Sequence, residues 1–430
     1  MNDSPAATPK PRLLLIFSQT FIPDPASVGQ HIADVAIEMA RRGHAVRVYT
    51  SARGYEDPTV KYPKRETIQG VDVRRLGLAS FGKKSIFTRI LGTFSFMIQC
   101  LWLALFTPRV GGIFFSTSPP LIGVAACIAR FFRRVPIVYW AMDLNPDQLI
   151  MMGKIKADSL AARVLERVNR MILRRSARIF ALDRFMAERL LQRGDYAAKI
   201  SILPPWPHDD HMEPVERAHN PFRQKLGLQD KFVVMYSGNH SPANPLTTLL
   251  QAAVHFKDHP DLCFLFVGGG LGKREVEETI QKHGLKNALS LPYQPLADLG
   301  NSLSAADVHV VSLGDNMVGI IHPCKIYGAM SIARPILYFG PEPSHVTDIM
   351  EAYPIGRRVA HGDVAGAVAA IQGFLSSPEA ERVEMGQTAH GAMAEKLSQA
   401  RLCRDFCDLL DASLRPGTGP VPEGEARGSG

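Results

Sequence analysis

Apolar runs of strand length alternate with segments of helical period along almost the whole chain, and this alternation constrains the fold more than any other feature. The first run, Leu13–Phe17, contains no polar residue, as expected for a parallel strand that helices cover on both faces. A turn-rich loop, a helical segment ending at Arg41 and a second strand, Ala45–Thr50, follow it. Strict alternation of this kind predicts α/β domains with parallel sheets.

The alternation occurs in two series that a proline-rich break separates. The first series ends with the strand Lys199–Leu203, after which Pro204, Pro205 and Pro207 interrupt the pattern. The second series begins at Phe232–Ser237, and 430 residues are too many for one hydrophobic core. The predicted parts are an N-terminal domain (1–205), a linker (206–221), a C-terminal domain (222–395), a C-terminal helix able to pack back on the N-terminal domain (396–414) and a disordered Gly/Pro-rich tail (415–430).

The charge and the cysteine pattern narrow the classes of function. The formal net charge of +8 is moderate for this length and permits contact with an anionic lipid surface or a phosphorylated substrate. Because no run of basic residues is interleaved with aromatic residues, the sequence does not indicate a nucleic-acid-binding protein. The six cysteines show no spacing typical of metal ligands, and the polar N-terminus lacks the apolar core of a signal peptide. These features predict a reduced, cytoplasmic setting.

The segment Gly319–Pro335 is predicted to form a small-residue loop followed by a helix over Cys324–Ile332. It lies between two apolar strands, one ending at Leu313 and the other ending at Phe339. A helix N-terminus placed after a strand suits an anion, and phosphate above all. Lys325 lies in the first turn, where its charge opposes the helix dipole, and a lysine there is easier to explain if it binds a ligand. A solvated surface lysine is the alternative.

The apolar segment Ile86–Phe106 is about as long as a membrane span, but its polar residues and its place in the alternation argue against spanning. Basic residues accompany aromatic residues here: Gly82–Lys84 precedes the segment, Arg89 lies within it, and Phe131–Arg134 ends the next helix. This combination favours a helix that lies on an anionic membrane surface. A buried core helix flanked by solvated lysines is the alternative.

Eight short motifs occur in a specific order, although each of them alone is a weak signal. They are P-D-P-A-S-V-G (23–29), R-R-G-H-A-V-R-V-Y-T (41–50), S-T-S-P-P (116–120), D-L-N-P-D (143–147), Y-S-G-N (236–239), F-V-G-G-G (266–270), S-A-A-D-V (304–308) and H-P-C-K-I-Y-G-A-M (322–330). Together they resemble the retaining glycosyltransferases of family 4, over roughly Leu13 to Leu410. That family has the GT-B architecture, an α/β fold of two Rossmann-like parallel-sheet domains that face an interdomain cleft. The most similar subgroup builds lipid-linked surface polysaccharide or similar glycoconjugates.

The resemblance implies a nucleotide-sugar donor bound mainly to the second domain and an acceptor bound to the first. Lys325 would stabilise the donor diphosphate as the leaving group, and Asp143 would face the acceptor hydroxyl. Gly29 would let the first-domain loop approach the same phosphates. The departing phosphate oxygen can itself take the acceptor proton, so catalysis would be mostly electrostatics and positioning. The other implied donor-binding groups are Gly238, Asn239, His240, Gly268, Gly269, Tyr293, Gln294 and the N–H groups of Gly319, Ile320 and Ile321.

The chain also departs from the family pattern. Many relatives have two glutamates where this chain has Ile320 and Gly328, and a cleft histidine where it has Met142. In the region of their basic pair, only His240 can carry a charge here. The absence of an Asp-x-Asp motif fits an architecture that needs no metal or other cofactor. Asp143 has a structural alternative as the side chain that stabilises a turn.

The sequence therefore predicts a cytoplasmic enzyme attached peripherally to the inner face of the membrane. It would move a sugar from a nucleotide-sugar donor to a lipid-linked or other glycan acceptor. A catalytically silent relative that binds a nucleotide-sugar or acts as a scaffold is the first alternative, because of the departures above. A nucleotide-sugar epimerase of the same architecture is the second, although it normally needs further carboxylates and histidines.

Overall fold

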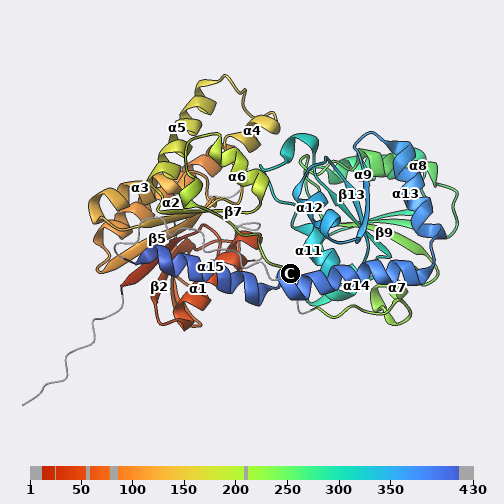
Figure 1. Cartoon of the computed structure of the whole chain (residues 1–430), viewed down its shortest axis with the longest axis horizontal. Helices are drawn as coiled ribbons and strands as arrows, with labels where there is room; N and C mark the ends of the chain where they lie inside the picture. Colours follow the sequence, from red (N-terminus) through yellow and green to blue (C-terminus); the bar gives the residue numbers. More distant parts are fainter. Residues whose placement is uncertain (1–11, 25, 55–58, 78–85, 208–211, 416–430) are drawn as a thin grey trace, which may run out of the picture.

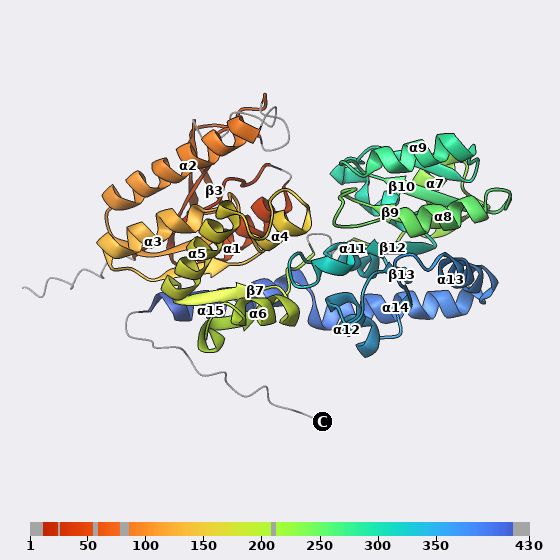
Figure 2. The same ribbon diagram turned by 90° about the horizontal axis from the view of Figure 1, so that it is seen from above.

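The computed structural model describes residues 12–24, 26–54, 59–77, 86–207 and 212–415. Two α/β domains lie side by side, and the last two helices run from one to the other (Figures 1 and 2). The predicted α/β class with two parallel-sheet domains is confirmed. The predicted tail and the basic segment at 82–84 lie outside the described residues.

The N-terminal domain is built on an eight-stranded sheet with the order β3-β4-β2-β1-β5-β6-β7-β8. Its central strands are buried on both faces, which is why they appear in the sequence as unbroken apolar runs. Only β3 runs antiparallel, at the edge of the sheet; it was not predicted, because its residues R-E-T-I are too exposed and polar to stand out. The strands are β1 (Leu13–Phe17), β2 (Ala45–Ser51), β3 (Arg65–Ile68), β4 (Val71–Leu76), β5 (Val110–Ser116), β6 (Ile137–Trp140), β7 (Arg178–Ala181) and β8 (Ile200–Ile202).

Six helices of the described residues connect these strands, and the short helix α4 was not predicted. They are α1 (Ser27–Arg41), α2 (Ile86–Phe106), α3 (Ile122–Arg133), α4 (Asp147–Met151), α5 (Leu160–Arg175) and α6 (Arg184–Leu191). In the ranges that the structure covers, no helix combines the length and the apolarity required to cross a membrane.

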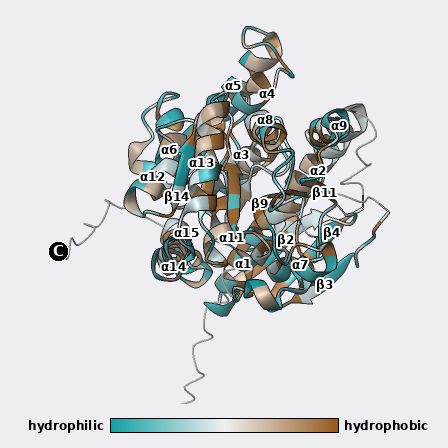
Figure 3. Ribbon diagram, turned by 90° about the vertical axis from the view of Figure 1, so that its right-hand side faces the viewer, coloured by the Kyte–Doolittle hydropathy of each residue, from teal (hydrophilic) through white to brown (hydrophobic). Residues whose placement is uncertain are grey.

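The C-terminal domain contains a six-stranded, fully parallel sheet with the order β11-β10-β9-β12-β13-β14. Its apolar strands lie between the helices in the end-on view of Figure 3. The strands are β9 (Phe232–Ser237), β10 (Leu262–Val267), β11 (Ala288–Leu291), β12 (Val308–Ser312), β13 (Ile336–Phe339) and β14 (Gly356–Val359). The helices are α7 (Pro221–Leu226), α8 (Thr247–His255), α9 (Lys273–His283), α10 (Leu299–Ser304), α11 (Lys325–Ser331), α12 (His345–Ala352) and α13 (Val364–Ser376).

The two C-terminal helices connect the domains. Helix α14 (Glu379–Lys396) packs on the C-terminal domain, where Ala389 and Met393 join its core, and α15 (Gln399–Leu414) packs on the N-terminal domain. The buried side chain of Phe406 anchors α15: its ring centre lies 4.0 Å from that of Phe180 and 4.4 Å from that of Trp140. The C-terminal segment of the chain thus completes the core of the first domain.

Replacing Phe406 should destabilise the N-terminal domain strongly. Removing a buried phenylalanine side chain costs about 3–5 kcal/mol, because apolar burial is lost and a cavity remains. We expect Phe406→Ala to lower the free energy of unfolding by that amount in urea denaturation followed by tryptophan fluorescence. Phe131→Ala is the matched control, since the Phe131 side chain is 67% exposed and its loss should change the free energy by less than about 0.5 kcal/mol. Equal effects of the two variants would contradict the docking of α15.

Candidate functional site

Lys325 is the first residue of α11 and lies at the carboxyl ends of β9 and β12. Its Nζ atom lies 5.1 Å from the centre of the Tyr236 ring. With the Asn244 amide in the orientation in which its nitrogen donates to the carbonyl oxygen of Ser312, the amide oxygen accepts a hydrogen bond from Nζ at 3.3 Å. Burial lowers the pKa of Lys325 to about 8, so the amine is still mostly protonated at pH 7. No carboxylate of the described residues pairs with it. A partly buried cation without an acidic partner favours an anionic ligand.

The loops after β9 and β10 are packed tightly on each other, and glycines make this packing possible. Gly238 and Gly268 have φ values of +129° and +133°, where other residues would be strained. A Cβ at Gly268 would collide with the carbonyl oxygen of Gly238, and one at Gly238 would lie 2.6 Å from Cε of Lys325. The N–H of His240 donates to the carbonyl oxygen of Gly269 at 2.7 Å. These two loops therefore form one surface beside Lys325.

His240 is buried within this surface, whereas the predicted nucleoside-facing residues lie at its outer edge. The Nδ1 atom of His240 lies 3.1 Å from the carbonyl oxygen of Gly238, and burial lowers its pKa, so the imidazole is neutral at pH 7. Its Nε2 atom has no hydrogen-bond partner in the described part of the chain. The Tyr293 ring lies over Gly269 and is exposed, and the Gln294 side chain donates to the carbonyl oxygen of Pro292. His240 thus adds a buried polar atom, but no charge, to the site.

The structure corrects the role predicted for the loop Gly319–Ile321. The N–H groups of Ile320 and Ile321 both donate to the carbonyl oxygen of Met317, at 3.0 and 3.3 Å, and are not free for a diphosphate. Gly319 has a φ of +70°, and a Cβ there would lie 2.5 Å from the carbonyl oxygen of Phe185 in the N-terminal domain. The loop therefore packs against the other domain, and α11 starts at Lys325 and not at Cys324.

A second correction concerns the place of Gly29 in the fold, which was predicted to be the last residue of a loop; its role next to the donor phosphates stays a prediction. Helix α1 starts at Ser27, so Gly29 lies in its first turn and is buried. A Cβ at this position would lie 3.0 Å from the backbone of Thr20 and Phe21. Packing against the chain's own preceding loop is therefore a sufficient reason for a glycine at position 29.

Asp143 follows β6 and is partly buried. Burial raises the pKa of its carboxyl group to about 6. The side chain of Gln148 donates to it at a long distance of 3.4 Å, and no backbone N–H of the described residues does so, which argues against the turn-stabilising alternative. The next residue, Leu144, donates its N–H to the carbonyl oxygen of Ile320 at 3.0 Å. The segment that carries Asp143 is thus bonded to the loop that precedes Lys325.

Lys273 is one functional residue that the sequence reasoning missed. It is the first residue of α9, and its Nζ atom donates to the carbonyl oxygens of Gly268 at 2.8 Å and Leu291 at 2.7 Å. It therefore connects the glycine loop after β10 to the end of β11. The only sequence signal is a lysine in the first turn of a helix that follows a glycine-rich loop, which is the signal that identified Lys325.

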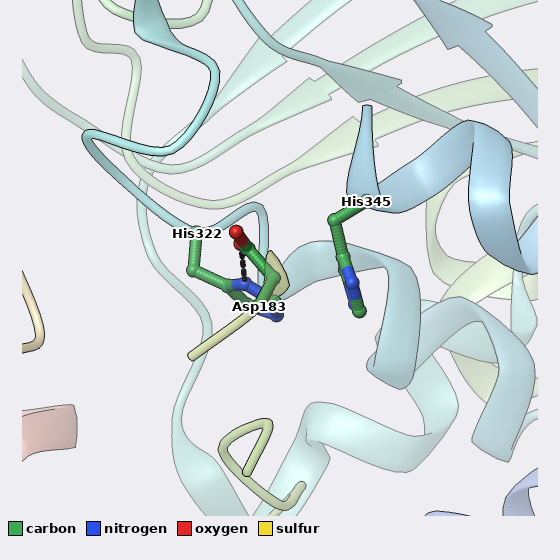
Figure 4. A group of neighbouring side chains, drawn as sticks. All are labelled: Asp183, His322 and His345. Atoms are coloured by element: carbon green, nitrogen blue, oxygen red, sulfur yellow. Dashed lines mark hydrogen bonds and ion pairs between the residues drawn. The ribbon is translucent and has the colours of Figure 1, made fainter. Parts of the chain in front are cut away.

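A group of polar side chains at the domain interface was also missed. Asp183 follows β7, and its carboxylate accepts hydrogen bonds from the N–H of Met186 and from Nδ1 of His322, both at 2.8 Å (Figure 4). The other nitrogen of His322 is bonded to Tyr327, whose hydroxyl also contacts Nε2 of His345 at 2.8 Å. Potential metal-ligand atoms of Asp183, His322 and His345 lie within 4.8 Å of one another. The two histidines and the carboxylate come from segments far apart in the sequence.

Two α/β domains built on parallel sheets meet here, and two facing domains of this kind define the GT-B architecture. Family models agree with this class. The model described as "Glycosyl transferase 4-like domain" matches residues 27–206, and the model described as "Glycosyl transferases group 1" matches residues 219–390. The chain belongs to the family 4 glycosyltransferases, and the predicted enzyme class is confirmed.

Two relatives are named as glycosyltransferases, and the name of one of them refers to colanic acid biosynthesis. WbjE of Pseudomonas aeruginosa, named as a glycosyltransferase, is 26% identical over 253 residues, which are 58% of this chain and 62% of WbjE. WcaI of Escherichia coli (strain K12), named as a colanic acid biosynthesis glycosyl transferase, is 23% identical over 389 residues, which are 85% of this chain and 93% of WcaI. The match thus spans less than two thirds of WbjE but nearly all of WcaI.

Solved structures agree with the fold. Anabaena Alr3699/HepE in complex with UDP and glucose has a TM-score of 0.69 at 16% identity, covering 93% of this chain and all of that one. WaaG, a glycosyltransferase involved in lipopolysaccharide biosynthesis, has a TM-score of 0.65 at 15% identity, covering 92% of this chain and 99% of that one. At this level of identity the likeness establishes the architecture only.

Asp143→Asn should stabilise the protein, and more so at alkaline pH. The folded-state pKa of about 6 lies above the ordinary value of 3.8, so ionisation of this carboxyl group disfavours the folded state as pH rises through that interval. We expect the free energy of unfolding of the variant, relative to wild type, to rise by about 1 kcal/mol between pH 5 and pH 8. Urea denaturation at the two pH values measures this difference. A constant difference would show that Asp143 is not perturbed.

Proposed function

We propose that this enzyme transfers a sugar from a nucleotide-sugar donor to a lipid-linked or other glycan acceptor, with retention of configuration, in the synthesis of a surface polysaccharide or glycoconjugate. The observation that carries the proposal is Lys325, which is partly buried beside the glycine loops after β9 and β10 and has no carboxylate partner among the described residues. Three similar proteins support this substrate class: WcaI, which is named for colanic acid biosynthesis, HepE, whose structure contains UDP and glucose, and WaaG, which is involved in lipopolysaccharide biosynthesis.

In this proposal the C-terminal domain binds the donor and stabilises the leaving group. The diphosphate lies against Gly238–His240 and Lys325, where the buried Nε2 atom of His240 gains a partner. As the glycosidic bond to phosphate breaks, negative charge develops next to the ammonium group, which stabilises it without a metal ion. Gly268 and Gly269, with Tyr293 and Gln294, border the nucleoside.

The N-terminal domain binds the acceptor. Asp143 accepts a hydrogen bond from the attacking hydroxyl and orients it, and the departing phosphate oxygen takes its proton on the same face of the sugar. This front-face attack retains the configuration and needs no protein nucleophile. Asp143 then contributes by positioning the acceptor. Such positioning lowers the activation free energy by several kcal/mol only if the two domains keep the acceptor hydroxyl and the donor in a fixed relative position.

Lys325→Ala should weaken nucleotide binding. Because the variant loses the cation next to the diphosphate, we expect the dissociation constant of the nucleotide that binds to rise at least about tenfold, or roughly 1.4 kcal/mol. Titration calorimetry with UDP, GDP and ADP measures this. Lys282→Ala is the matched control, because it removes the same charge from an exposed position in the last turn of α9, on the same domain. For wild type, affinity should also fall from pH 7 to pH 9, as Lys325 deprotonates near its pKa of about 8.

Absence of binding for all three nucleotides would contradict the proposal and favour the silent-relative alternative. A free epimerised sugar nucleotide among the reaction products would favour the epimerase alternative.

We further propose that the enzyme binds the surface of an anionic membrane through α2, α3 and α5. Exposed apolar side chains recur every four residues along α2, with Trp102 exposed by 64%, and continue on the neighbouring α3. A stripe of this spacing on a helix is otherwise expected to face a core. The exposed apolar residues are Ile90, Leu91, Phe94, Ile98, Trp102 and Phe106 on α2, with Ile128, Phe131 and Phe132 on α3.

Basic side chains lie on the next helix, α5, and at the end of α3. Helix α5 packs beside α3 and carries four exposed arginines at helical spacing, Arg163, Arg167, Arg170 and Arg174. Arg134, at the end of α3, is also exposed. Apolar insertion combined with basic residues suits anionic headgroups, and each basic residue near the surface is worth about 1 kcal/mol.

The double variant Ile98→Ser, Trp102→Ser should lose membrane binding. We expect wild type to float with phosphatidylglycerol-containing liposomes at low salt, and the variant to remain in the dense fraction, because its apolar insertion is removed. Val383→Ser, which removes an exposed apolar residue of α14 on the other domain, is the control. A wild-type protein that fails to float would exclude this attachment.

A further inference from the structure

A chain of four hydrogen-bonded side chains crosses the interface between the domains. It runs from Asp183 at the end of β7, through His322 and Tyr327, to His345 at the start of α12. Figure 4 shows Asp183, His322 and His345 with the bond between the first two. Each of the three links is 2.8 Å long. Only the first link, between Asp183 and His322, joins the two domains, and these side chains are 3% and 1% exposed.

The Asp183 carboxylate is stabilised in its charged form by this contact. Burial alone would raise its pKa, but the hydrogen bonds from His322 and from the N–H of Met186 outweigh burial and lower the pKa. A buried carboxylate that loses such a partner costs several kcal/mol, unless water reaches it. The pair therefore favours the arrangement in which the two domains touch at this point.

His322 lies in the loop Val318–Cys324, which connects β12 to Lys325, and three backbone contacts in this loop bind the same domain. The carbonyl oxygen of Val318 accepts from Nε of Arg189 at 2.6 Å, Gly319 packs on Phe185, and the carbonyl oxygen of Ile320 accepts from Leu144. The loop that leads to Lys325 is thus attached to the N-terminal domain at two places, which are helix α6 and the segment that carries Asp143.

We propose that Asp183 and His322 form a closure latch, that is, an interdomain pair through which the N-terminal domain positions the loop Val318–Cys324 that leads to Lys325. Both are positioning residues: they act through the loop and do not touch the substrates. Tyr327 and His345 hold the His322 ring from the side opposite Asp183 and fix its orientation. The link to catalysis rests on the proposed function of Lys325, but the latch itself is a property of the domain interface.

The hydrogen-bond pattern favours a latch over a metal site. Both nitrogens of His322 and both carboxylate oxygens of Asp183 already have partners, so a cation would have to replace bonds that are complete. Divalent metal binding by Asp183, His322 and His345 is therefore an outcome that the test must distinguish.

Backbone amide exchange measured by mass spectrometry tests the latch without any ligand. Asp183→Ser keeps a good helix N-cap for α6 but is too short to reach His322, and His322→Phe removes the bond from the other side. In both variants, exchange should accelerate at least about tenfold, or roughly 1.4 kcal/mol, in peptides covering 141–149 and 316–326, while strands β1 and β9 stay protected. Protected strands show that the variants remain folded.

Arg184→Ala is the matched control for these variants. It removes the neighbouring interdomain pair with Asp348, which is 2.7 Å long but exposed, and exposed pairs contribute little. Unchanged exchange in Asp183→Ser and His322→Phe, or an equal acceleration in Arg184→Ala, would overturn the latch. A 1:1 zinc complex of wild type that His345→Ala abolishes would overturn it in favour of a metal site.

UDP calorimetry on the same variants separates the latch from the proposed function. Weaker UDP binding in Asp183→Ser, with wild-type affinity in Arg184→Ala, is expected if the latch positions Lys325. If wild type binds no nucleotide, the proposed function fails, whereas the exchange result still decides whether the latch exists.

Discussion

One backbone hydrogen bond, from the N–H of Leu144 to the carbonyl oxygen of Ile320, sets the register between the two halves of the candidate site. It joins the segment that carries the acceptor-facing Asp143 to the loop that leads to Lys325. Side-chain bonds alone would leave this register loose, because long side chains have many rotamers. A bond between two main-chain groups has no such freedom. The positive φ of Gly319 lets the loop approach the other domain closely enough to form it.

The sequence was sufficient to predict the fold because the central strands of both sheets are covered on both faces. Full burial requires continuous apolar runs, and β9, whose first five residues are buried, has the predicted bounds. The elements that were missed, β3 and α4, lack this signal for the same reason. Strand β3 is an edge strand whose side chains are largely exposed, and α4 is a single short turn without a buried residue. Neither is required to form a core, so neither leaves a pattern in the sequence.

The site could be predicted only where its residues are close in sequence. The glycine loops and Lys325 follow strand ends, and the motif order identified them, but their packing reasons depend on contacts between loops. Asp183 and His322 are separated by 139 residues, and nothing in the sequence near either residue indicates that they pair. The N–H groups of Ile320 and Ile321 were assigned to the diphosphate because a loop before a helix usually leaves such groups free. The turn at Met317 uses them instead.

These bonded N–H groups make the electrostatics of the site depend on a single side chain. Helix α11 has seven residues, and the effect of a helix dipole falls off within the first turn, so α11 cannot replace a full charge. His240 is neutral because it is buried.

Lys325 is therefore the group that must balance the charge of a diphosphate, and its partial burial has two opposing consequences. Desolvation strengthens its attraction for an anion, but it also lowers the pKa to about 8. Deeper burial would remove the charge at neutral pH, whereas full exposure would weaken the attraction, so the position of Lys325 lies between these limits.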